Sequence, residues 1–394
     1  MSAMNTLTIP HLPADMLLPG DAVPYFTQRT PKNPNFSFGS FAGRYIVFCF
    51  LGSAADPLGR DAVAALNAHR QLFARQGLYV FAISNDPQDE TENRLLMDNG
   101  LGVFWDFDCK ISRLYGALPK NGSLDGVLPQ KRFWLVLDPG LRVMATFPFG
   151  AEDSGSAPVI SFLETLPPPD TSVGFLIPPP VLVIPRVFEP EMCQRLIQEY
   201  EIHGGQETGV MQEKNGKTVA VHNHTFKRRK DYVIEDKELI DATQMRIRRR
   251  VVPEILKVHF FKITRMERYI VCCYAAEDEA HFSAHRDNTT RGTAHRRFAV
   301  SINLNSEFEG GEVSFPEYGP RGFKPPPGGA VVFSCSLLHA VSKVTAGKRY
   351  AFLPFLYDEE AAKIRAANNQ FLGEDVSKYQ VPEPPQIGQV VANV

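Results

Sequence analysis

The stretch ERYIVCCYAAEDEAHFSAHRD, residues 267–287, governs the interpretation of the second half of this 394-residue chain. ERYIVCCYA and HFSAHRD are short, largely apolar segments separated by polar residues, a pattern that indicates two strands. Because side chains alternate between the faces of a strand, His285 and Asp287 project from one face, and Phe282 and Ala284 from the other. An imidazole and a carboxylate are therefore expected side by side.

Further short apolar segments follow, with Gly and Pro between them: RRFAVSINLN (296–305), GGEVSFPEY (310–318), GAVVFSCSLLHAV (329–341) and KRYAFLPFLYD (348–358). Many short strands at near-regular spacing predict a β-sandwich or a jelly roll. Of these we expect the jelly roll, or double-stranded β-helix. Flanking helices are expected upstream, at 190–204 and 237–259, with a polar stretch between them to about residue 225. The second helix should bend or break at Pro253, because proline lacks a backbone N–H.

The segment LPPPDTSVGFLIPPP, residues 166–180, contains six prolines and cannot continue a helix or a central strand. We therefore expect a domain boundary here. The predicted organisation is an N-terminal domain, a Pro-rich linker, a C-terminal domain with its core at 269–358, and a tail: 1–165, 166–180, 181–375 and 376–394.

The N-terminal half has the pattern of an α/β domain. RYIVFCFLG (44–52) and LYVFAISN (78–85) read as buried strands, and the amphipathic segment between them, 61–77, reads as a helix. Together they predict a βαβ unit. A further helix is expected at 111–118, followed at 132–147 by two strands joined by an Asp-Pro-Gly turn.

Composition argues against nucleic-acid and membrane partners. The net charge is −2 with 44% apolar and 22% charged residues, and no apolar run approaches the ~18 residues of a membrane span. Two basic runs, KRRK (227–230) and RIRRR (246–250), are compatible with a basic patch, or with a charged loop and a solvated helix face. Without a secretory signal pattern, a cytoplasmic location is expected.

The six cysteines are scattered, without a CxxC pair, and most lie in apolar runs: Cys49, Cys109, Cys193, Cys272, Cys273 and Cys335. This pattern is typical of buried free thiols rather than of a disulfide framework.

A metal site is the main chemical prediction. His285-x-Asp287 is weak evidence alone in a chain with ten histidines, but His339 ends the apolar strand AVVFSCSLLH and supplies a third ligand. Two His and one carboxylate leave one side of a metal open, as Fe(II) oxygenases require. If the strands that flank KVTAGK pair antiparallel, Arg349 would lie beside the metal and grip the distal carboxylate of a 2-oxo acid.

The motifs YIVCCY, HFSAHRD, FAVSINLN, EGGEVSFPEYG, PGGAVVFSCSLLHAV and KRYAFLPFLYD resemble the prolyl 4-hydroxylase-like group of iron and 2-oxoglutarate-dependent dioxygenases. The resemblance implies that His285, Asp287 and His339 bind Fe(II), that Arg349 binds 2-oxoglutarate, and that Tyr274 contacts this co-substrate. It also implies ascorbate as reductant, and hydroxylation rather than halogenation because a carboxylate occupies position 287.

Two neighbours of these residues are further candidates. Asn303, on the inward face of FAVSINLN, is a candidate polar wall of the cofactor pocket, and Lys348 is a minor alternative to Arg349. The implied substrate is a prolyl residue of an extended peptide, although a small carboxylate fits equally well. Positive charge in two loops, 206–235 and 288–296, predicts a basic rim that attracts either acidic substrate.

Other histidines keep open alternatives. His222 and His224 lie in a polar loop that suits either a stray metal or solvent. His281 is expected at the pocket mouth or in packing. His295, with Arg296 and Arg297, is compatible with substrate contact or with charges at the start of a strand.

In the N-terminal half, PGDAVPYF (19–26), FAGRYIVFCFLG (41–52), WDFDCKISRLYGAL (105–118) and RFWLVLDPGLRV (132–143) resemble the thioredoxin-like fold of peroxiredoxins and alkyl hydroperoxide reductases. The peroxidatic cysteine of that family should follow the first strand, but the segment there, GSAADPLGRDAV, has none. Arg132 matches the family's active-site arginine, yet without a thiolate there is no nucleophile. The alternative function, a thiol peroxidase or redox sensor, would have to use Cys49 or Cys109.

Overall fold

The computed structural model describes residues 17–75, 77–95, 101–121, 130–374, 376, 378 and 379. The chain divides into two compact units, Met1–Pro178 with Pro316–Pro320 and Pro179–Phe315 with Arg321–Val394. Most of the expected tail, 376–394, lies outside the described residues. Within the described ranges, no helix combines the length and apolar character that crossing a membrane requires.

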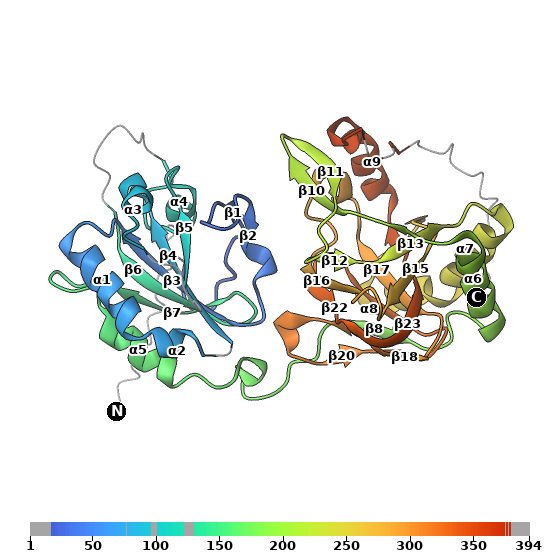
Figure 1. Ribbon diagram of the computed structural model, residues 1–394, viewed down its shortest axis with the longest axis horizontal. Coiled ribbons are helices and arrows are strands. Elements are labelled where there is room, and N and C mark those ends of the chain that lie inside the picture. The colour runs from blue at the N-terminus through green and yellow to red at the C-terminus, as the bar shows by residue number, and fades with distance from the viewer. Residues whose placement is uncertain are drawn as a thin grey trace, which may run out of the picture. The chain divides into compact units, whose positions relative to one another are not determined.

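The described part of the N-terminal unit forms a five-stranded sheet in the order β5-β4-β3-β6-β7 (Figure 1). Strands β3, β4 and β5 are mutually parallel, and β6 runs antiparallel to both of its neighbours, β3 and β7. Every residue of the central strand β3 is buried, because this strand is covered on both faces. The result is the expected α/β thioredoxin-like fold, with strands β3 Tyr45–Gly52, β4 Leu78–Ser84, β5 Leu101–Trp105, β6 Phe133–Leu137 and β7 Val143–Pro148.

The helices of this unit differ from expectation in length. The helix expected at 61–77 begins earlier, because the Asp56 carboxylate caps it by accepting a 3.0 Å hydrogen bond from the backbone N–H of Gly59. It then breaks at His69 into two helices. The helix expected at 111–118 is shorter than predicted and ends at Leu114. The helices are α1 Pro57–Ala68, α2 Arg70–Phe73, α3 Pro87–Thr91, α4 Lys110–Leu114 and α5 Ser156–Glu164.

The described part of the C-terminal unit contains two main sheets, as a jelly roll requires (Figure 1). The smaller has the order β12-β16-β22-β19-β20, with strands Lys227–Arg228, His281–His285, His339–Val341, Val313–Ser314 and Gly322–Phe323. The larger has the order β14-β24-β17-β23-β15-β13-β9, with β8, β18 and β21 attached. Its strands are Arg265–Glu267, Phe355–Tyr357, Phe298–Asn303, Val344–Phe352, Ile270–Ala275, Lys230–Val233, Gln206–Glu207, Leu182–Ile184, Phe308–Gly310 and Ala330–Ser334.

The larger sheet has two different faces. Val271, Ile302 and Phe352 belong to a core shared with residues of three helices, α6 Pro190–His203, α7 Lys237–Arg250 and α8 Val252–His259. Residues of the opposite alternation on the same strands, Tyr274, Ser301 and Arg349, line a pocket instead. The two-residue period of the strands therefore separates the helix-covered core from a cavity with polar walls.

The remaining elements show where the sequence expectation was incomplete. The predicted helix 237–259 is broken at Val251, and Pro253 falls in the first turn of α8, where a missing N–H is tolerated. The stretch expected to be polar and irregular up to about 225 contains a hairpin, β10 Val210–Lys214 with β11 Lys217–Val221. Helix α9, Glu359–Ala367, follows the last strand.

Candidate iron and 2-oxoglutarate site

Three side chains predicted as metal ligands come together in the C-terminal unit. One ligand atom from each of His285, Asp287 and His339 can be chosen so that all lie within 4.8 Å of one another. The Nε2 atoms of the two histidines each lie 3.4 Å from a different carboxylate oxygen of Asp287. Strands β16 and β22 pair with His285 opposite His339, so this part of the smaller sheet aligns two of the three side chains.

The expected alternation along HFSAHRD is only partly right. Strand β16 ends at His285, and the register shifts between Phe282 and His285. Asp287 lies beyond the strand, where its backbone N–H donates a 2.9 Å hydrogen bond to the carbonyl of Cys335. A loop contact, rather than strand geometry, therefore holds the carboxylate beside the imidazoles.

Both imidazoles are oriented by backbone carbonyls. The Nδ1 atom of His285 lies 2.8 Å from the carbonyl oxygen of Ser283, and Nδ1 of His339 lies 3.0 Å from that of Leu337. A carbonyl accepts only, so Nδ1 carries the proton in each ring and Nε2 presents a lone pair toward Asp287. This tautomer is the one that a metal ligand requires.

The electrostatics of the three groups also suit a cation. Burial lowers the pKa of His339 to about 4, so its ring is neutral at neutral pH. Burial opposes ionisation of Asp287, but in acid, where His339 and His285 are protonated, their positive charges outweigh burial and hold the pKa of Asp287 well below its usual range. An ionised carboxylate and a neutral imidazole are the forms that bind a divalent metal.

Arg349 lines the same pocket, and the residue is only 1% exposed. Its Nε donates a 3.0 Å hydrogen bond to Oδ1 of Asn303, and its Nη2 donates a 2.8 Å hydrogen bond to Oγ of Ser301. Its Nη1 is buried and has no hydrogen-bond partner among the described residues. A buried cationic donor without a partner is costly, so this nitrogen fits an anion that enters the pocket.

The reason given for placing Arg349 there was wrong, although the residue does reach the pocket. Strands β22 and β23, which carry His339 and Arg349, do not pair. Strand β22 pairs with β16 and β19 in the smaller sheet, and β23 pairs with β15, β17 and β18. The pocket is therefore lined from both sheets, with the ligand triad and the cation on different ones.

Tyr274 also lines this pocket and is almost fully buried. Its ring centre lies 5.4 Å from Cζ of Arg349, and its hydroxyl accepts a 3.3 Å hydrogen bond from Nη1 of Arg229. Arg229 forms a buried ion pair with Asp231, with Nε and Nη2 each 2.7 Å from a carboxylate oxygen. Tyr274 therefore stands between two arginines.

Asn303 does not line the pocket. Its Oδ1 accepts from Arg349, and its Nδ2 donates a 2.8 Å hydrogen bond to the carbonyl of Pro325, so its amide group supports Arg349 rather than a ligand. Ser301, two residues earlier on the same face of β17, does reach the pocket, and the alternation that selected Asn303 was sufficient to find it. Lys348 is exposed.

The other candidate histidines, His222, His224, His281 and His295, lie outside this pocket. His281 ring nitrogens contact the carbonyls of Glu279 and Thr225. His224 pairs with Glu207 at an exposed site, and His222 is exposed. His295 is buried against Glu267 at 3.1 Å instead of facing the substrate pocket.

The basic rim expected at 206–235 and 288–296 is formed only in part: Arg291 is exposed and the side chains of Arg228 and Lys230 are partly exposed, whereas other charges of these loops are buried or paired. In KRRK, Lys227 and Arg229 are buried in strands or their connection. Arg296 pairs with Glu267 at 2.8 Å. Carboxylates and carbonyls bind the side chains of Lys227, Arg229 and Arg296 inside the unit. KRRK as a whole therefore does not form an exposed patch. In RIRRR, Arg246 and Arg250 bind Glu189 along α7.

In the N-terminal unit, a carboxylate occupies the segment where a thiolate would be expected. Both oxygens of Asp56 accept 2.6 Å hydrogen bonds from Arg132. Cys49 is fully buried in β3, and burial raises its pKa well above the usual value; burial, followed by the nearby Asp106, also raises the pKa of Cys109. Neither thiol has the low pKa and access of a peroxide-reactive cysteine.

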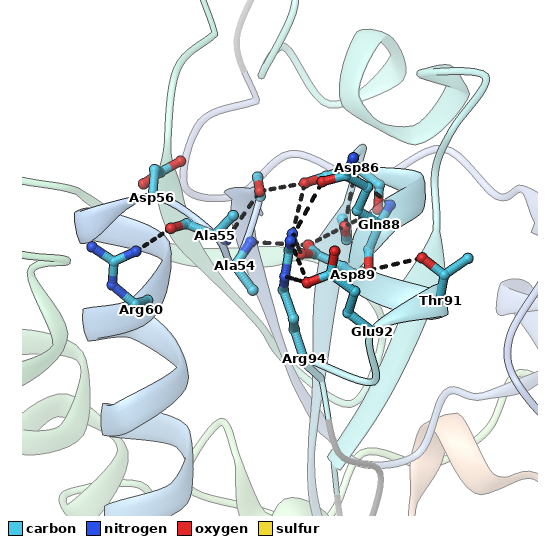
Figure 2. Close-up of polar contacts among 12 residues, drawn as sticks. Ala54, Ala55, Asp56, Arg60, Asp86, Gln88, Asp89, Thr91, Glu92 and Arg94 are labelled. Atoms are coloured by element: carbon cyan, nitrogen blue, oxygen red, sulfur yellow. Dashed lines mark hydrogen bonds and ion pairs between the residues drawn. The ribbon is translucent and has the colours of Figure 1, made fainter.

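A second network of carboxylates, formed by Asp86 and Asp89 with Arg94, lies beside the segment that follows β3, as Figure 2 shows. Asp89 is fully buried and accepts hydrogen bonds from the backbone N–H of Ala54 at 2.9 Å and from the hydroxyl of Ser84 at 2.7 Å. Arg94 lies 3.1 Å from Asp89 and 3.2 Å from Asp86. The segment after β3 is thus held by satisfied polar contacts.

Comparison with known proteins assigns a family to each unit. Residues 269–357 match the 2OG-Fe(II) oxygenase superfamily, and residues 19–144 match the AhpC/TSA family. Similar solved structures for the first are the viral collagen prolyl hydroxylase of Paramecium bursaria Chlorella virus 1 (17% identity, 45% of this chain and 94% of that chain, TM-score 0.34) and a prolyl-4-hydroxylase of Pseudomonas putida (16%, 45% and 92%, 0.34).

For the N-terminal unit, a similar structure is the peroxidoxin BcpB of Mycobacterium tuberculosis, with 18% identity over 38% of this chain and 99% of that chain, and a TM-score of 0.33. The oxygenase superfamily implies Fe(II) and 2-oxoglutarate as cofactor and co-substrate. The chain therefore joins an AhpC/TSA-family domain of thioredoxin-like fold to a 2OG-Fe(II) oxygenase domain of jelly-roll fold, and the second domain makes it a dioxygenase.

Proposed function

We propose that the C-terminal unit is an Fe(II)- and 2-oxoglutarate-dependent hydroxylase, with His285, Asp287 and His339 as the iron ligands and Arg349 as the 2-oxoglutarate anchor. The observation that carries this proposal is one pocket lined by two correctly protonated imidazoles, an ionised carboxylate and a buried arginine with an unused donor. The donor set is the nitrogen and oxygen set that Fe(II) accepts.

Each residue has a defined task in this proposal. The histidines offer Nε2 because the carbonyls of Ser283 and Leu337 hold the Nδ1 protons. Arg349 would bind the distal carboxylate of 2-oxoglutarate through Nη1, while Ser301 and Asn303 fix the guanidinium plane. Bound Fe(II) would supply the redox chemistry that couples decarboxylation of 2-oxoglutarate to hydroxylation of a substrate C–H bond.

Tyr274 completes the co-substrate side of the pocket. Its hydroxyl is held by Arg229, so the ring keeps one orientation beside Arg349. We assign it to contact with 2-oxoglutarate. We also assign ascorbate as the reductant that keeps the iron ferrous, in line with the motif resemblance.

For the substrate, the motif resemblance supports a prolyl residue of an extended peptide, and a small carboxylate remains the competing class. An extended peptide is largely ordered before binding and crosses a pocket mouth at low entropic cost. All six cysteines are buried and unpaired, which supports a reducing compartment such as the cytoplasm.

The test is succinate formation by the full chain, with Fe(II), 2-oxoglutarate and O₂ supplied together and then omitted one at a time. We expect slow succinate release without added substrate that stops on omission of any one component. Mass spectrometry for +16 Da products, with and without 2-oxoglutarate, then identifies the hydroxylated substrate. Succinate release that persists without Fe(II) would contradict the proposal.

A further inference from the structure

Three arginines line the pocket that contains the ligand triad: Arg229, Arg268 and Arg349. Two of them have an assigned anion. Arg229 is paired with Asp231, and Arg349 is assigned to 2-oxoglutarate. Arg268 is the third, and no sequence motif singled it out.

Arg268 forms only a weak ion pair with a carboxylate. Its Nη2 lies 3.7 Å from Oδ2 of Asp231. That oxygen already accepts a 2.7 Å hydrogen bond from Arg229 and a 2.6 Å hydrogen bond from the hydroxyl of Thr208. Burial and the neighbouring Arg229 lower the pKa of Arg268 to about 10, in keeping with a cation that is incompletely neutralised.

Arg268 is also the most accessible of the three. Its side chain is 27% exposed, against 4% for Arg229, and the whole of Arg349 is 1% exposed. Its Cζ lies 5.0 Å from the ring centre of Phe355, another residue of the pocket lining, so the guanidinium is held at the pocket while part of it meets solvent. A molecule that enters from solvent can reach it.

The backbone at Arg268 is strained. This residue joins β14 to β15 with φ +63°, in the left-handed region that is unfavourable for residues other than glycine. Such conformations persist where surrounding structure imposes them and are concentrated at functional sites. Here the conformation accompanies an arginine that faces the ligand pocket.

The formal charges around the pocket, with Fe(II) and 2-oxoglutarate bound, sum to about one excess positive charge. Asp231 and Asp287 offset two of the three arginines. The two positive charges of Fe(II) are offset by the 2-oxoglutarate dianion, so roughly one positive charge remains. The nearby Lys227 adds little, because burial lowers its pKa to about 6. One residual charge matches a monoanionic carboxylate better than a doubly charged phosphate.

We propose that Arg268 binds a carboxylate of the primary substrate and thereby selects substrates that carry this group close to the hydroxylated carbon. The inference rests on the proposed function, because Arg349 must be occupied by 2-oxoglutarate. The carboxylate belongs either to a free small molecule or to an acidic side chain of a peptide, and both present the same oxygens to a guanidinium.

Binding without turnover tests this assignment. The full chain is loaded with Co(II) in place of Fe(II) and with 2-oxoglutarate, and is titrated calorimetrically with two matched pairs. The first pair is N-acetylproline and N-acetylprolinamide; the second is N-acetyl-aspartyl-prolinamide and N-acetyl-asparaginyl-prolinamide. In at least one pair we expect the carboxylate to bind about tenfold tighter than the amide, or more. The pair that shows this preference identifies the source of the carboxylate.

Variants assign the preference to one side chain. Arg268→Gln should reduce the ratio of affinities to about one, and Arg268→Lys should retain part of it because the charge remains. Arg249→Gln, which makes the same charge change on the exposed side of α7, should leave the ratio as in the wild type.

The outcomes separate this inference from the proposed function. Equal affinities within both pairs, absence of binding by all four compounds, or a preference that survives in Arg268→Gln would each overturn the role of Arg268 while the function stands. Failure of the chain to bind Co(II) and 2-oxoglutarate would overturn the function, and the inference with it.

Discussion

Arg349 on β23 donates a 2.8 Å hydrogen bond to Oγ of Ser301 on β17, and these two strands pair in the larger sheet. The hydroxyl and the amide of Asn303 hold two of the three guanidinium nitrogens, which leaves only Nη1 for a ligand. The direction of the cation is thus determined before any co-substrate enters, which reduces the entropy lost on binding.

Replacing Arg349 by Lys should raise the KM for 2-oxoglutarate about tenfold to a hundredfold, because an ammonium cannot contact Ser301, Asn303 and a carboxylate with one planar fork. Succinate formation as a function of 2-oxoglutarate concentration measures this. Lys348→Ala is the matched control, since the side chain is exposed, and its KM should stay at the wild-type value. A larger effect from Lys348→Ala would reverse the assignment.

Removal of one imidazole should abolish metal binding at the triad. His285→Ala or His339→Ala should lower bound Co(II) from about one per chain to less than a tenth, because two remaining ligands hold a divalent metal weakly. Metal content after gel filtration, together with succinate release, checks this. His281→Ala is the control on the same strand, outside the pocket. Full metal content in both triad variants would refute the ligand assignment.

A third prediction concerns stability. Glu267 is buried and contacts Arg296 at 2.8 Å and Arg365 at 2.6 Å. Glu267→Gln leaves these cations underpaired and should reduce the free energy of unfolding of the C-terminal unit by about 3–5 kcal/mol. Glu360→Gln, at an exposed pair on α9, should change it by less than about 0.5 kcal/mol.

Two spectroscopic signals separate the units in this measurement. The chain has two tryptophans, Trp105 and Trp134, and both belong to the N-terminal sheet. In urea, the fluorescence transition should therefore stay unchanged in Glu267→Gln, while the circular dichroism transition of the C-terminal unit moves to lower urea. A fluorescence midpoint that shifts equally would show that the effect is not confined to the C-terminal unit.

The N-terminal unit should not reduce peroxide. Peroxide consumption by the full chain with a dithiol reductant should equal the rate without protein, because Cys49 is buried with a raised pKa and Arg132 is paired with Asp56. Cys49→Ser and Cys109→Ser should behave as the wild type. Activity above background that is lost in either variant would establish the thiol function instead.

Whether a site residue can be predicted from the sequence depends on how far along the chain it lies from the residues that it contacts. His285 and Asp287 follow from local spacing, and Arg349 was selected for its chemistry although the assumed strand pairing is absent. Arg268 was overlooked, because its place in the pocket depends on pairings between distant strands and on a left-handed backbone that an arginine rarely adopts.

Some structural features that were not predicted do have an indicator in the sequence. The hairpin β10–β11 turns at Asn215-Gly216, both with positive φ, and an Asn-Gly pair between two runs is a strong hairpin indicator. The burial of Arg229 within KRRK had a weaker signal: Arg229 and Asp231 alternate onto one face of the strand. The division of the predicted helix 61–77 at His69 has no evident signal in the sequence.

His285 and His339 of the proposed ligand triad lie on the smaller sheet and Arg349 lies on the larger one, so iron and 2-oxoglutarate bound in the pocket would link the two layers of the jelly roll. By mass action, a ligand present at a hundred times its dissociation constant adds about 2.7 kcal/mol to the stability of the folded state. If the pocket binds iron and 2-oxoglutarate as proposed, the thermal stability of the C-terminal unit should therefore rise with the supply of either ligand.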